Sequence, residues 1–290
     1  MARNKVREPK EKEQYLKLTP KTFLLYVVLI LFCIIVIAPL VIVFSSSLRS
    51  PENQKSPLML FIEFSGKSYA RAFTQMNYPM ELLNSLMTTG LAVVVIVFIA
   101  SMAAWPIGRI RTKTAKFFYY FFISGLIIPS QMVIVPIAQT FNRLNIPNNR
   151  FTPVLMFITC SLPFSVFLFS GFVKSVPGEI EESAYIDGAS LWQRFSTILF
   201  PLLEPAIVSV VITQGMWIWN DYFYPMVFVS KQQQFSLPVG MLQFLGDKEN
   251  PAQWNVLFAS CVLCALPLIA AFAALQKEFV NGIAAGAVKG

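Results

Sequence analysis

Five carboxylates lie close together in one stretch of the sequence, and few basic residues lie among them. They are Glu179, Glu181, Glu182, Asp187 and Glu204. Long apolar segments flank the stretch on both sides, so it is predicted to be a loop displayed at a membrane surface. A chain this hydrophobic has no packing reason to keep such a loop, and we therefore expect the loop to dock onto another protein.

The rest of the chain offers these carboxylates no partner for catalysis or metal binding. The sequence contains no His, which removes the usual metal ligand and the usual proton relay. It has no Gly-x-x-x-x-Gly-Lys-Ser/Thr phosphate loop, no paired intramembrane carboxylates and no nucleophile–base pair at readable spacing. We therefore expect no catalytic residue, no metal site and no cofactor bound by this chain. If ATP drives it, the ATPase is another polypeptide.

Local signals predict that the loop is a helix–turn–helix. Pro177 suits the first turn of a helix, where its missing N–H costs little, and the early acids suit the positive end of that helix. Gly188 can take the left-handed conformation that ends a helix. Ser190 followed by Gln193 predicts a capping box that opens a second helix, which Pro201 would end after about three turns.

The composition predicts an all-α membrane protein. The chain is 56% hydrophobic and 13% charged, with 27 Phe, which lies outside the range of soluble domains. Six continuous apolar runs reach the length of about 20 residues that a bilayer core requires, whereas barrel strands would alternate. The predicted spans are Phe23–Phe44, Leu86–Ile107, Phe117–Gln139, Pro153–Val173, Ala206–Val229 and Trp254–Leu275.

The distribution of Lys and Arg predicts the orientation. If the N-terminus is cytoplasmic, 15 of the 23 basic residues fall in inside segments and 8 in outside segments. We therefore expect both termini to be cytoplasmic, with an N-terminal segment 1–22, a transmembrane domain 23–275 whose loop 174–204 is also inside, and a tail 276–290. Membrane orientation explains the net charge of +8, which needs no nucleic acid.

The loop resembles the EAA loop of ATP-binding-cassette (ABC) importer permeases. That motif consists of Glu-Ala-Ala, three residues, Gly, nine residues, Ile, one residue and Leu-Pro. Five positions match at this spacing, while Ser183 replaces the first Ala and Phe200 replaces Leu. The resemblance implies a type I ABC importer permease fold with a cytoplasmic coupling loop. The residues assigned to ATPase coupling are Glu182, Ala184, Asp187, Gly188, Ile198 and Pro201.

Further resemblance covers most of the chain and narrows the family. Asn84-Ser85 is similar to the family's start of the second span, and the pattern Trp219–Tyr222 with Pro225 is similar to one in sugar permeases. The C-terminal stretch from Gln276 resembles carbohydrate permeases of the maltose-transporter type, and the chain is identified with their second permease subunit.

The resemblance also implies the partners and the location. Two homologous permeases pair, two ATPases bind below with ATP and Mg²⁺, and an extracytoplasmic binding protein delivers a sugar or oligosaccharide. The chain would then be a multi-pass protein of a bacterial plasma membrane that forms half of the pathway.

Polar residues inside the predicted spans are candidates for the substrate pathway, because amides and charges at membrane depth usually face a cavity or a partner helix. Aromatic rings beside amides and a carboxylate suit the apolar faces and hydroxyls of sugars. Two other roles stay open: Trp and Tyr also gather at membrane interfaces, and amides also bond across helices as packing contacts. The candidates are Gln131, Gln214, Trp217, Asn220 and Asp221, and Trp219 is expected to point away from them.

Two alternatives compete with carbohydrate import. The first is an ABC importer permease for a non-sugar solute such as a polyol or a phosphodiester. The second is a secondary transporter, which would require ionisable residues in several spans for ion coupling. Because only Asp221 lies well within an apolar span, the sequence favours the ABC permease.

Overall fold

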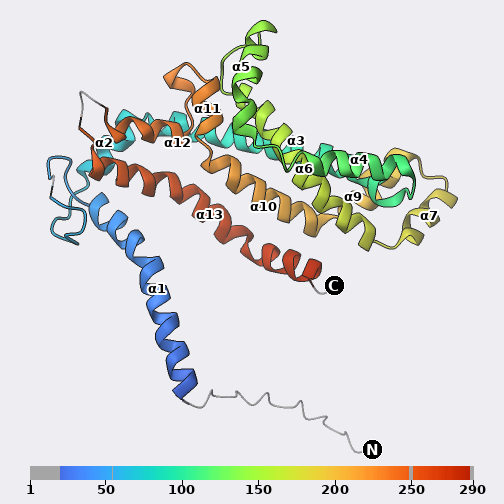
Figure 1. Ribbon diagram of the computed structural model, residues 1–290, viewed down its shortest axis with the longest axis horizontal. Coiled ribbons are helices and arrows are strands. Elements are labelled where there is room, and N and C mark those ends of the chain that lie inside the picture. Colours follow the sequence, from blue (N-terminus) through green and yellow to red (C-terminus); the bar gives the residue numbers. More distant parts are fainter. Residues whose placement is uncertain (1–19, 54, 248–250, 288–290) are drawn as a thin grey trace, which may run out of the picture.

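The protein is a bundle of helices, and the part of the chain that the structure describes contains no strand (Figure 1). The computed structural model describes residues 20–53, 55–247 and 251–287. Most of the N-terminal segment 1–22 and the last three residues lie outside the described residues.

Four described helices are long and apolar enough to cross a membrane. They contain the first, second, fourth and sixth predicted spans. α13 continues past the expected end of the last span, so position 275 is not a helix end. The four helices are α1 (Pro20–Ser47), α3 (Tyr78–Arg109), α6 (Thr152–Ser175) and α13 (Trp254–Ala287).

The third predicted span is not one helix, which corrects the prediction of six continuous spans. After Gly125 the chain turns, and Pro129 adopts an extended conformation. Proline fixes its own φ and disfavours helix in the residue before it, so the apolar run breaks here. The run is divided into α4 (Lys113–Ser124), a short 3-10 helix η1 (Ser130–Val133) and α5 (Ile134–Arg143).

The fifth predicted span ends earlier than expected. Its helix α10 (Glu204–Asn220) stops where Asp221 becomes extended, and the short α11 (Phe223–Phe228) follows. The Asp221 carboxylate accepts a hydrogen bond from the Tyr224 N–H at 2.9 Å, as side chains that start a new helix do. Hydropathy averaged along the sequence does not reveal this break, because the residues after it are also apolar.

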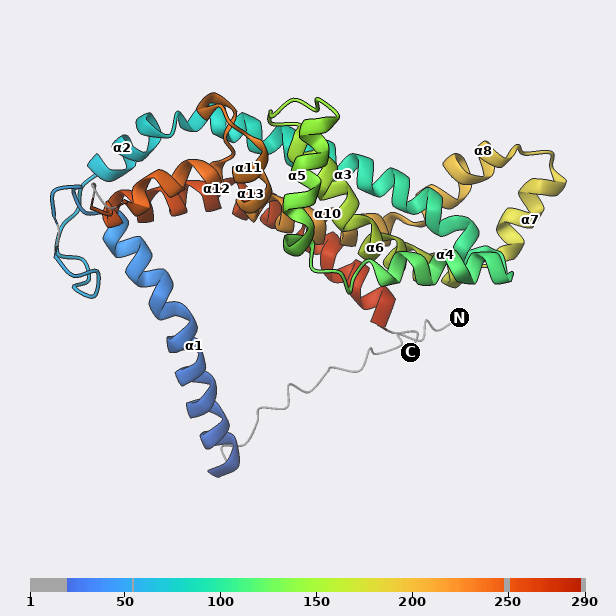
Figure 2. The same cartoon turned by 45° about the horizontal axis from the view of Figure 1, so that its top comes forward.

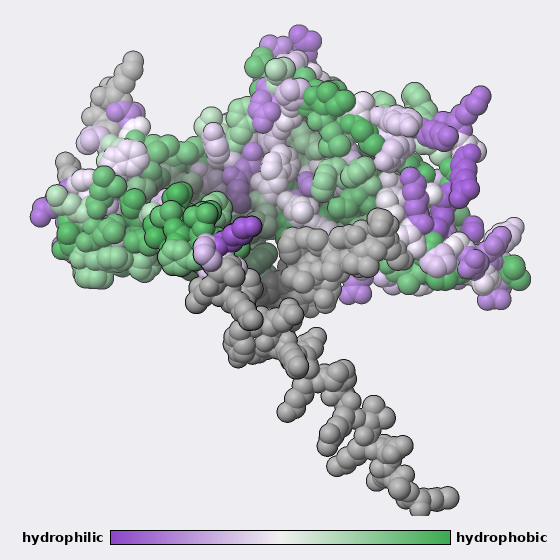
Figure 3. Space-filling view, turned by 60° about the horizontal axis from the view of Figure 1, so that its bottom comes forward, coloured by the Kyte–Doolittle hydropathy of each residue, from purple (hydrophilic) through white to green (hydrophobic). Residues whose placement is uncertain are grey.

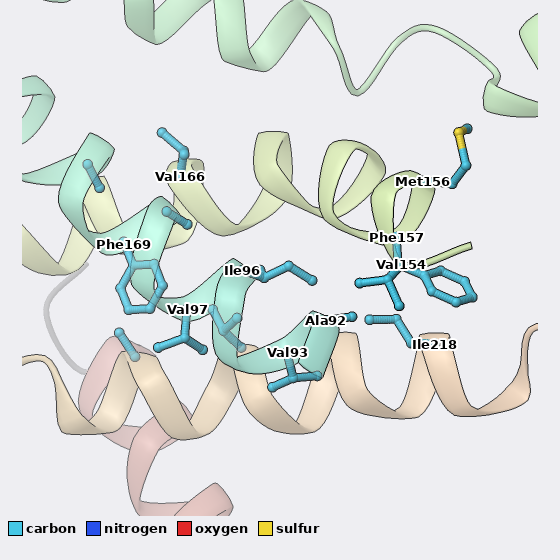
Figure 4. Close-up of a cluster of buried hydrophobic side chains, with 14 of the residues drawn as sticks. Ala92, Val93, Ile96, Val97, Val154, Met156, Phe157, Val166, Phe169 and Ile218 are labelled. Carbon is cyan, nitrogen blue, oxygen red and sulfur yellow. The ribbon is translucent and has the colours of Figure 1, made fainter. Parts of the chain in front are cut away.

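The core lies where α3 packs along α6, with α10 on the other side of α3 (Figures 1 and 4). Small residues allow the close approach: a Cβ built on Gly108 would lie 2.6 Å from Val173 Cγ1. Buried aliphatic and aromatic side chains fill the rest of this core. Those labelled in Figure 4 are Ala92, Val93, Ile96, Val97, Val154, Met156, Phe157, Val166, Phe169 and Ile218.

Helix α1 leaves the body of the molecule, as both ribbon views show (Figures 1 and 2). Its apolar side chains from residue 23 to residue 40 are exposed within the single chain. A helix that is apolar on all sides is stable only among lipids or against other helices. At the opposite end of the bundle, a hairpin of short helices projects beyond α4 (Figures 1 and 2). It contains four of the five carboxylates of the predicted loop, and the fifth, Glu204, begins α10.

Candidate functional site

The predicted helix–turn–helix is present as a hairpin formed by residues 178–202, hereafter the hairpin. Its first limb is α7 (Gly178–Ile186), preceded by Pro177. Its second limb begins with α8 (Leu191–Gln193), widens to a π-helix at Arg194–Leu199 and ends in α9 (Phe200–Leu202).

The turn between the limbs has the predicted chemistry. Gly188 has φ of +83°, a conformation that residues with a Cβ rarely adopt. The Ala189 N–H bonds to the Ala184 carbonyl and the Gly188 N–H to the Tyr185 carbonyl, which is the Schellman pattern of a helix end. Ser190 and Gln193 then form a reciprocal capping box, so both parts of the sequence prediction are confirmed.

The second limb ends within one residue of the predicted Pro201, because α9 stops at Leu202 and the chain bends by 72° before Glu204. It differs from the expected regular helix in its winding. The residues before Pro201 are wound as a π-helix, in which the Phe200 N–H reaches the Phe195 carbonyl. Pro201 has no N–H, and its ring would collide with the carbonyl four residues back, so the wider winding relieves that contact.

The first limb is fixed to α3 by a buried acid. Glu181 is 8% exposed, and its Oε1 accepts a hydrogen bond from Arg109 Nε at 2.7 Å, while Arg109 Nη2 lies in ion-pair contact with the same oxygen at 2.5 Å. Trp105 Nε1 donates to the other carboxylate oxygen at 2.8 Å. Arg109 also donates to the Val176 carbonyl at 2.7 Å, just before α7. Hydrogen bonds to charged groups are stronger than those between neutral groups, so these three contacts fix the base of the hairpin against α3.

The second limb is fixed to the same helix by aromatic rings. The buried Phe195 ring lies 5.7 Å from Trp105 and 6.3 Å from Phe98, measured between centroids. Trp192 contacts both Phe98 and Phe195. Trp105 therefore touches both limbs, one through its N–H and the other through its ring. Any tilt of the hairpin must move α3 with it.

The tip of the hairpin is exposed. Ile186 is 80% exposed and Trp192 is 54% exposed, with the Leu191 side chain also open. The Arg194 guanidinium lies 5.1 Å above the Tyr185 ring and braces the two limbs against each other. Of the residues assigned to ATPase coupling, Glu182, Asp187, Gly188 and Pro201 are exposed, and Ala184 and Ile198 are half-buried.

Sequence reasoning missed the residues that hold the hairpin. Glu181 was counted among the five acids and the early acids of the first helix, Arg109 only among the bases that indicate orientation, and Trp105 was not considered. One signal was available, since the second span ends in a lone aromatic and a base four residues apart, Trp105 and Arg109, on one helix face.

Among the candidate pathway residues near the end of α10, some side chains are buried and others are exposed. Gln214 is buried on α10, and Asn220 is exposed with its amide bonded to the Met216 carbonyl of its own helix. Trp217 is 40% exposed and meets the Phe157 and Tyr224 rings edge to face. Asp221 lies beyond the helix end, so it does not continue the expected α10 face of Gln214 and Trp217.

Gln131 lies in η1, which the structure brings to α11. The Tyr224 hydroxyl donates to Ser130 Oγ at 2.6 Å, next to the exposed Gln131. Segments about 90 residues apart in the chain thus meet beside Trp217. Trp219, which was expected to point away from the candidates, is buried, and its Nε1 donates to the Cys264 carbonyl of α13 at 3.2 Å.

Asn84 and Ser85 connect α3 to the segment between α11 and α12 (Leu237–Gly240). The Asn84 amide donates to the carbonyls of Gln233 and Phe235, and Ser85 Oγ accepts from the Leu237 N–H. These hydrogen bonds fix the N-terminal part of α3, and the ion pair of Arg109 fixes its C-terminal end. In the described part of the chain, no group of His, Cys, Asp and Glu could hold a metal ion.

A helical chain with several apolar helices and an exposed hairpin fixed to one of them has the features of a membrane transport subunit. Residues 96–284 match the family of binding-protein-dependent transport system inner membrane components. The match covers more than half of the chain, and the protein belongs to this family.

Relatives with assigned roles and a solved structure agree with this membership. The chain is 31% identical over 253 residues to the melibiose/raffinose/stachyose import permease MelC of Bacillus subtilis, covering 87% of this chain and 91% of MelC. It is 27% identical to the diacetylchitobiose uptake permease NgcG of Streptomyces coelicolor, covering 90% and 87%. The fold matches a bacterial ABC transporter involved in alginate import with a TM-score of 0.77 at 20% identity, covering 89% and 96%.

Proposed function

We propose that the chain is one permease half of an ATP-driven, binding-protein-dependent carbohydrate importer. The observation that carries the proposal is the hairpin, which has an exposed tip and is fixed to α3 at its base. Glu181, Arg109 and Trp105 make this attachment, hereafter the mount. A hairpin that only covered the membrane surface would need no such mount. The sugar relatives MelC and NgcG support a carbohydrate substrate rather than a polyol, a phosphodiester or a secondary transport cycle.

In this proposal the chain carries out no chemistry. Separate ATPase subunits bind ATP and Mg²⁺, and the tip residues around Ile186 and Leu191 dock into them. ATP-driven closure of the ATPases would displace the hairpin, and the Trp105 contacts would transmit the displacement to α3. Because α3 packs along α6 and α10, the displacement would alternate the access of the pathway near Gln214, Trp217 and Gln131.

A second permease completes the pathway in this proposal. α1 is apolar on all sides and lies away from the body, so in the assembly it would contact lipid and the second permease. An extracytoplasmic binding protein would deliver the sugar. Both termini and the hairpin would be cytoplasmic in a bacterial plasma membrane, as the Lys and Arg distribution favours.

A charge placed on the tip tests the docking role. Leu191→Glu should abolish co-purification of the ATPase subunits, because it inserts a carboxylate where an apolar contact is expected. The matched control is Leu144→Glu, which changes an equally exposed leucine at the end of α5, far from the hairpin. If both variants retain the ATPases equally, the hairpin is not the docking element.

Cysteine labelling tests the orientation, with the four native cysteines replaced by Ala. A cysteine at position 290, outside the described residues, should be shielded from an impermeant thiol reagent in intact cells. A cysteine replacing the exposed Lys67 should be labelled. The reverse pattern would contradict the proposed orientation and, with it, the docking of ATPases on a cytoplasmic hairpin.

A further inference from the structure

A basic pocket lies where α3 and α6 end and α4 begins, beside the base of the hairpin. Its volume is about 800 Å³. Figure 3 shows hydrophilic side chains gathered at this end of the molecule. No carboxylate lines the pocket, whereas four bases and two tyrosines do. They are Arg109, Arg111, Lys116, Lys174, Tyr119 and Tyr120.

Three of the four bases have no carboxylate partner. Arg109 is neutralised by Glu181. The other ion pair among the described residues, between Arg71 and Glu52, lies far from the pocket. The Lys174 ammonium lies 5.0 Å above the Tyr119 ring, and the side chains of Arg111 and Lys116 are exposed. The pocket therefore concentrates three positive charges that its own walls do not balance, and such a pocket attracts an anion.

An apolar groove opens from the basic pocket. The groove runs between α3 and α4, has a volume of about 380 Å³ and shares Ile107, Ile110 and Ala115 with the pocket. Its other walls include Phe118 and Phe122. No residue of α4 is buried, so the groove borders a surface that is open in the single chain and could contact lipid. The site thus combines a cationic end with an apolar channel.

We propose that the pocket binds the head group of an anionic phospholipid, whose acyl chain lies in the groove. Arg111, Lys116 and Lys174 would contact the phosphate, as basic pockets between membrane helices do at a cytoplasmic face. The proposal rests on the proposed orientation, which places the pocket in the cytoplasmic leaflet. A free phosphate would use the bases but not the groove, and an acidic protein segment would not require the apolar surface of α4.

The bound lipid would contact the hairpin's mount. Val176, Pro177 and Gly178 line the same pocket, and Arg109 holds both Val176 and Glu181. Occupation of the pocket would therefore restrain the base of the hairpin, so anionic lipid is expected to raise the coupling of ATP hydrolysis to transport.

Native mass spectrometry of the full-length chain in detergent tests the site. Phosphatidylglycerol and phosphatidylcholine are added in equal amounts, and wild type should retain phosphatidylglycerol at least about tenfold more tightly. The triple variant Arg111→Gln, Lys116→Gln, Lys174→Gln should lose this preference. The matched control removes three exposed bases elsewhere, with Lys67→Gln, Arg143→Gln and Lys231→Gln, and should keep it. Equal binding by both triple variants would overturn the proposal.

Two further measurements separate the lipid from other occupants. Ala115→Phe fills the groove without changing charge and should also weaken phosphatidylglycerol binding. Displacement of the lipid by excess inorganic phosphate would assign the pocket to a small anion. Loss of the lipid when the ATPase subunits assemble would assign it to the protein interface. Binding in detergent depends neither on docking nor on orientation, so failure here is distinguishable from failure of the proposed transport role.

Discussion

The hairpin and the polar cluster at the end of α10 were both predicted from sequence as functional, yet their structures differ. In the hairpin, the predicted positions Glu182 and Asp187 lie exposed on a mount made by other residues. In the α10 cluster, Asn220 and Asp221 bond to the backbone close to them. The hairpin is fixed by contacts with a distant helix, whereas the amide and carboxylate of the cluster bond to nearby backbone.

The difference follows from where each region meets its partner. A docking element must keep its shape before it binds, so the chain itself must fix it, here through Trp105 and Arg109. The proposed pathway, in contrast, would be closed by a second permease. In the single chain its polar groups bond to nearby backbone, and Trp217 is left partly open. Mutations in the mount are therefore expected to lower stability or the coupling of ATP hydrolysis to transport. Mutations in the α10 cluster are expected to weaken the response of ATP hydrolysis to sugar.

The largest effect is expected from breaking the ion pair of the mount. Arg109→Ala leaves the Glu181 carboxylate mostly buried without its cation, which should destabilise the chain by about 3 kcal/mol. Thermal unfolding in detergent measures this change, and transport should uncouple from ATP hydrolysis. Lys113→Ala is the control, because it removes an exposed base four residues later. The double variant Arg109→Met, Glu181→Leu should recover most of the stability; failure to recover would contradict the account.

The second effect separates the two contacts of Trp105. Trp105→Phe keeps a ring against Phe195 but removes the N–H that bonds to Glu181. A hydrogen bond to a charged group is worth about 2 kcal/mol, and the loss should appear in the same unfolding experiment. Trp105→Leu should cost more, because the ring contact is lost as well. If Phe and Leu are equivalent, the ring does not hold the second limb.

The third effect is confined to the turn. Gly188→Val forces a β-branched residue into positive φ and should cost about 1 kcal/mol or more. ATP hydrolysis should persist while transport falls, since the tip is displaced from its mount. Gly178→Ala is the control, because that glycine lacks a positive φ and has open space around it. Gly188→Asn should be milder than Val, as Asn tolerates this conformation. Normal transport by Gly188→Val would remove the rigid-lever interpretation.

The hairpin was predictable because its signals are local. Gly188, Ser190 and Gln193 act on residues within one turn, and their spacing determines the turn geometry. The mount was not predictable in the same way, since Trp105 and Glu181 are 76 residues apart. A contact at that distance depends on how α3 and α6 pack, which no local pattern encodes.

The breaks in the predicted spans were also missed by the sequence analysis. Four apolar runs became long helices, because nothing in them interrupts the backbone hydrogen bonds by more than a kink. In the third run, Gly125 and Pro129 divide the chain although the hydropathy stays high. In the fifth run, Asp221 starts a new helix by bonding to the Tyr224 N–H. Average hydropathy measures affinity for the membrane, whereas these breaks are decided by single backbone groups.

The smallest effect, and the one that tests the other half of the comparison, concerns two tryptophans on α10. Trp217 is partly open beside Tyr224, while Trp219 is buried and bonded to α13. Trp217→Ala should raise the sugar concentration for half-maximal ATPase stimulation by about threefold, the scale of one aromatic contact. Gln214→Ala should act in the same direction. Neither change should prevent assembly of the complex.

Trp219→Phe is the matched control for that pair, because it lies two residues away on the same helix. It should lower thermal stability through the lost hydrogen bond to the Cys264 carbonyl, with the sugar response unchanged. The two substitutions therefore predict opposite patterns, one in ligand response and the other in stability. If Trp217→Ala instead lowers stability and leaves the sugar response intact, then Trp217 only packs against Phe157 and Tyr224. The pathway would in that case lie elsewhere, and the contrast between hairpin and cluster would be one between two kinds of packing.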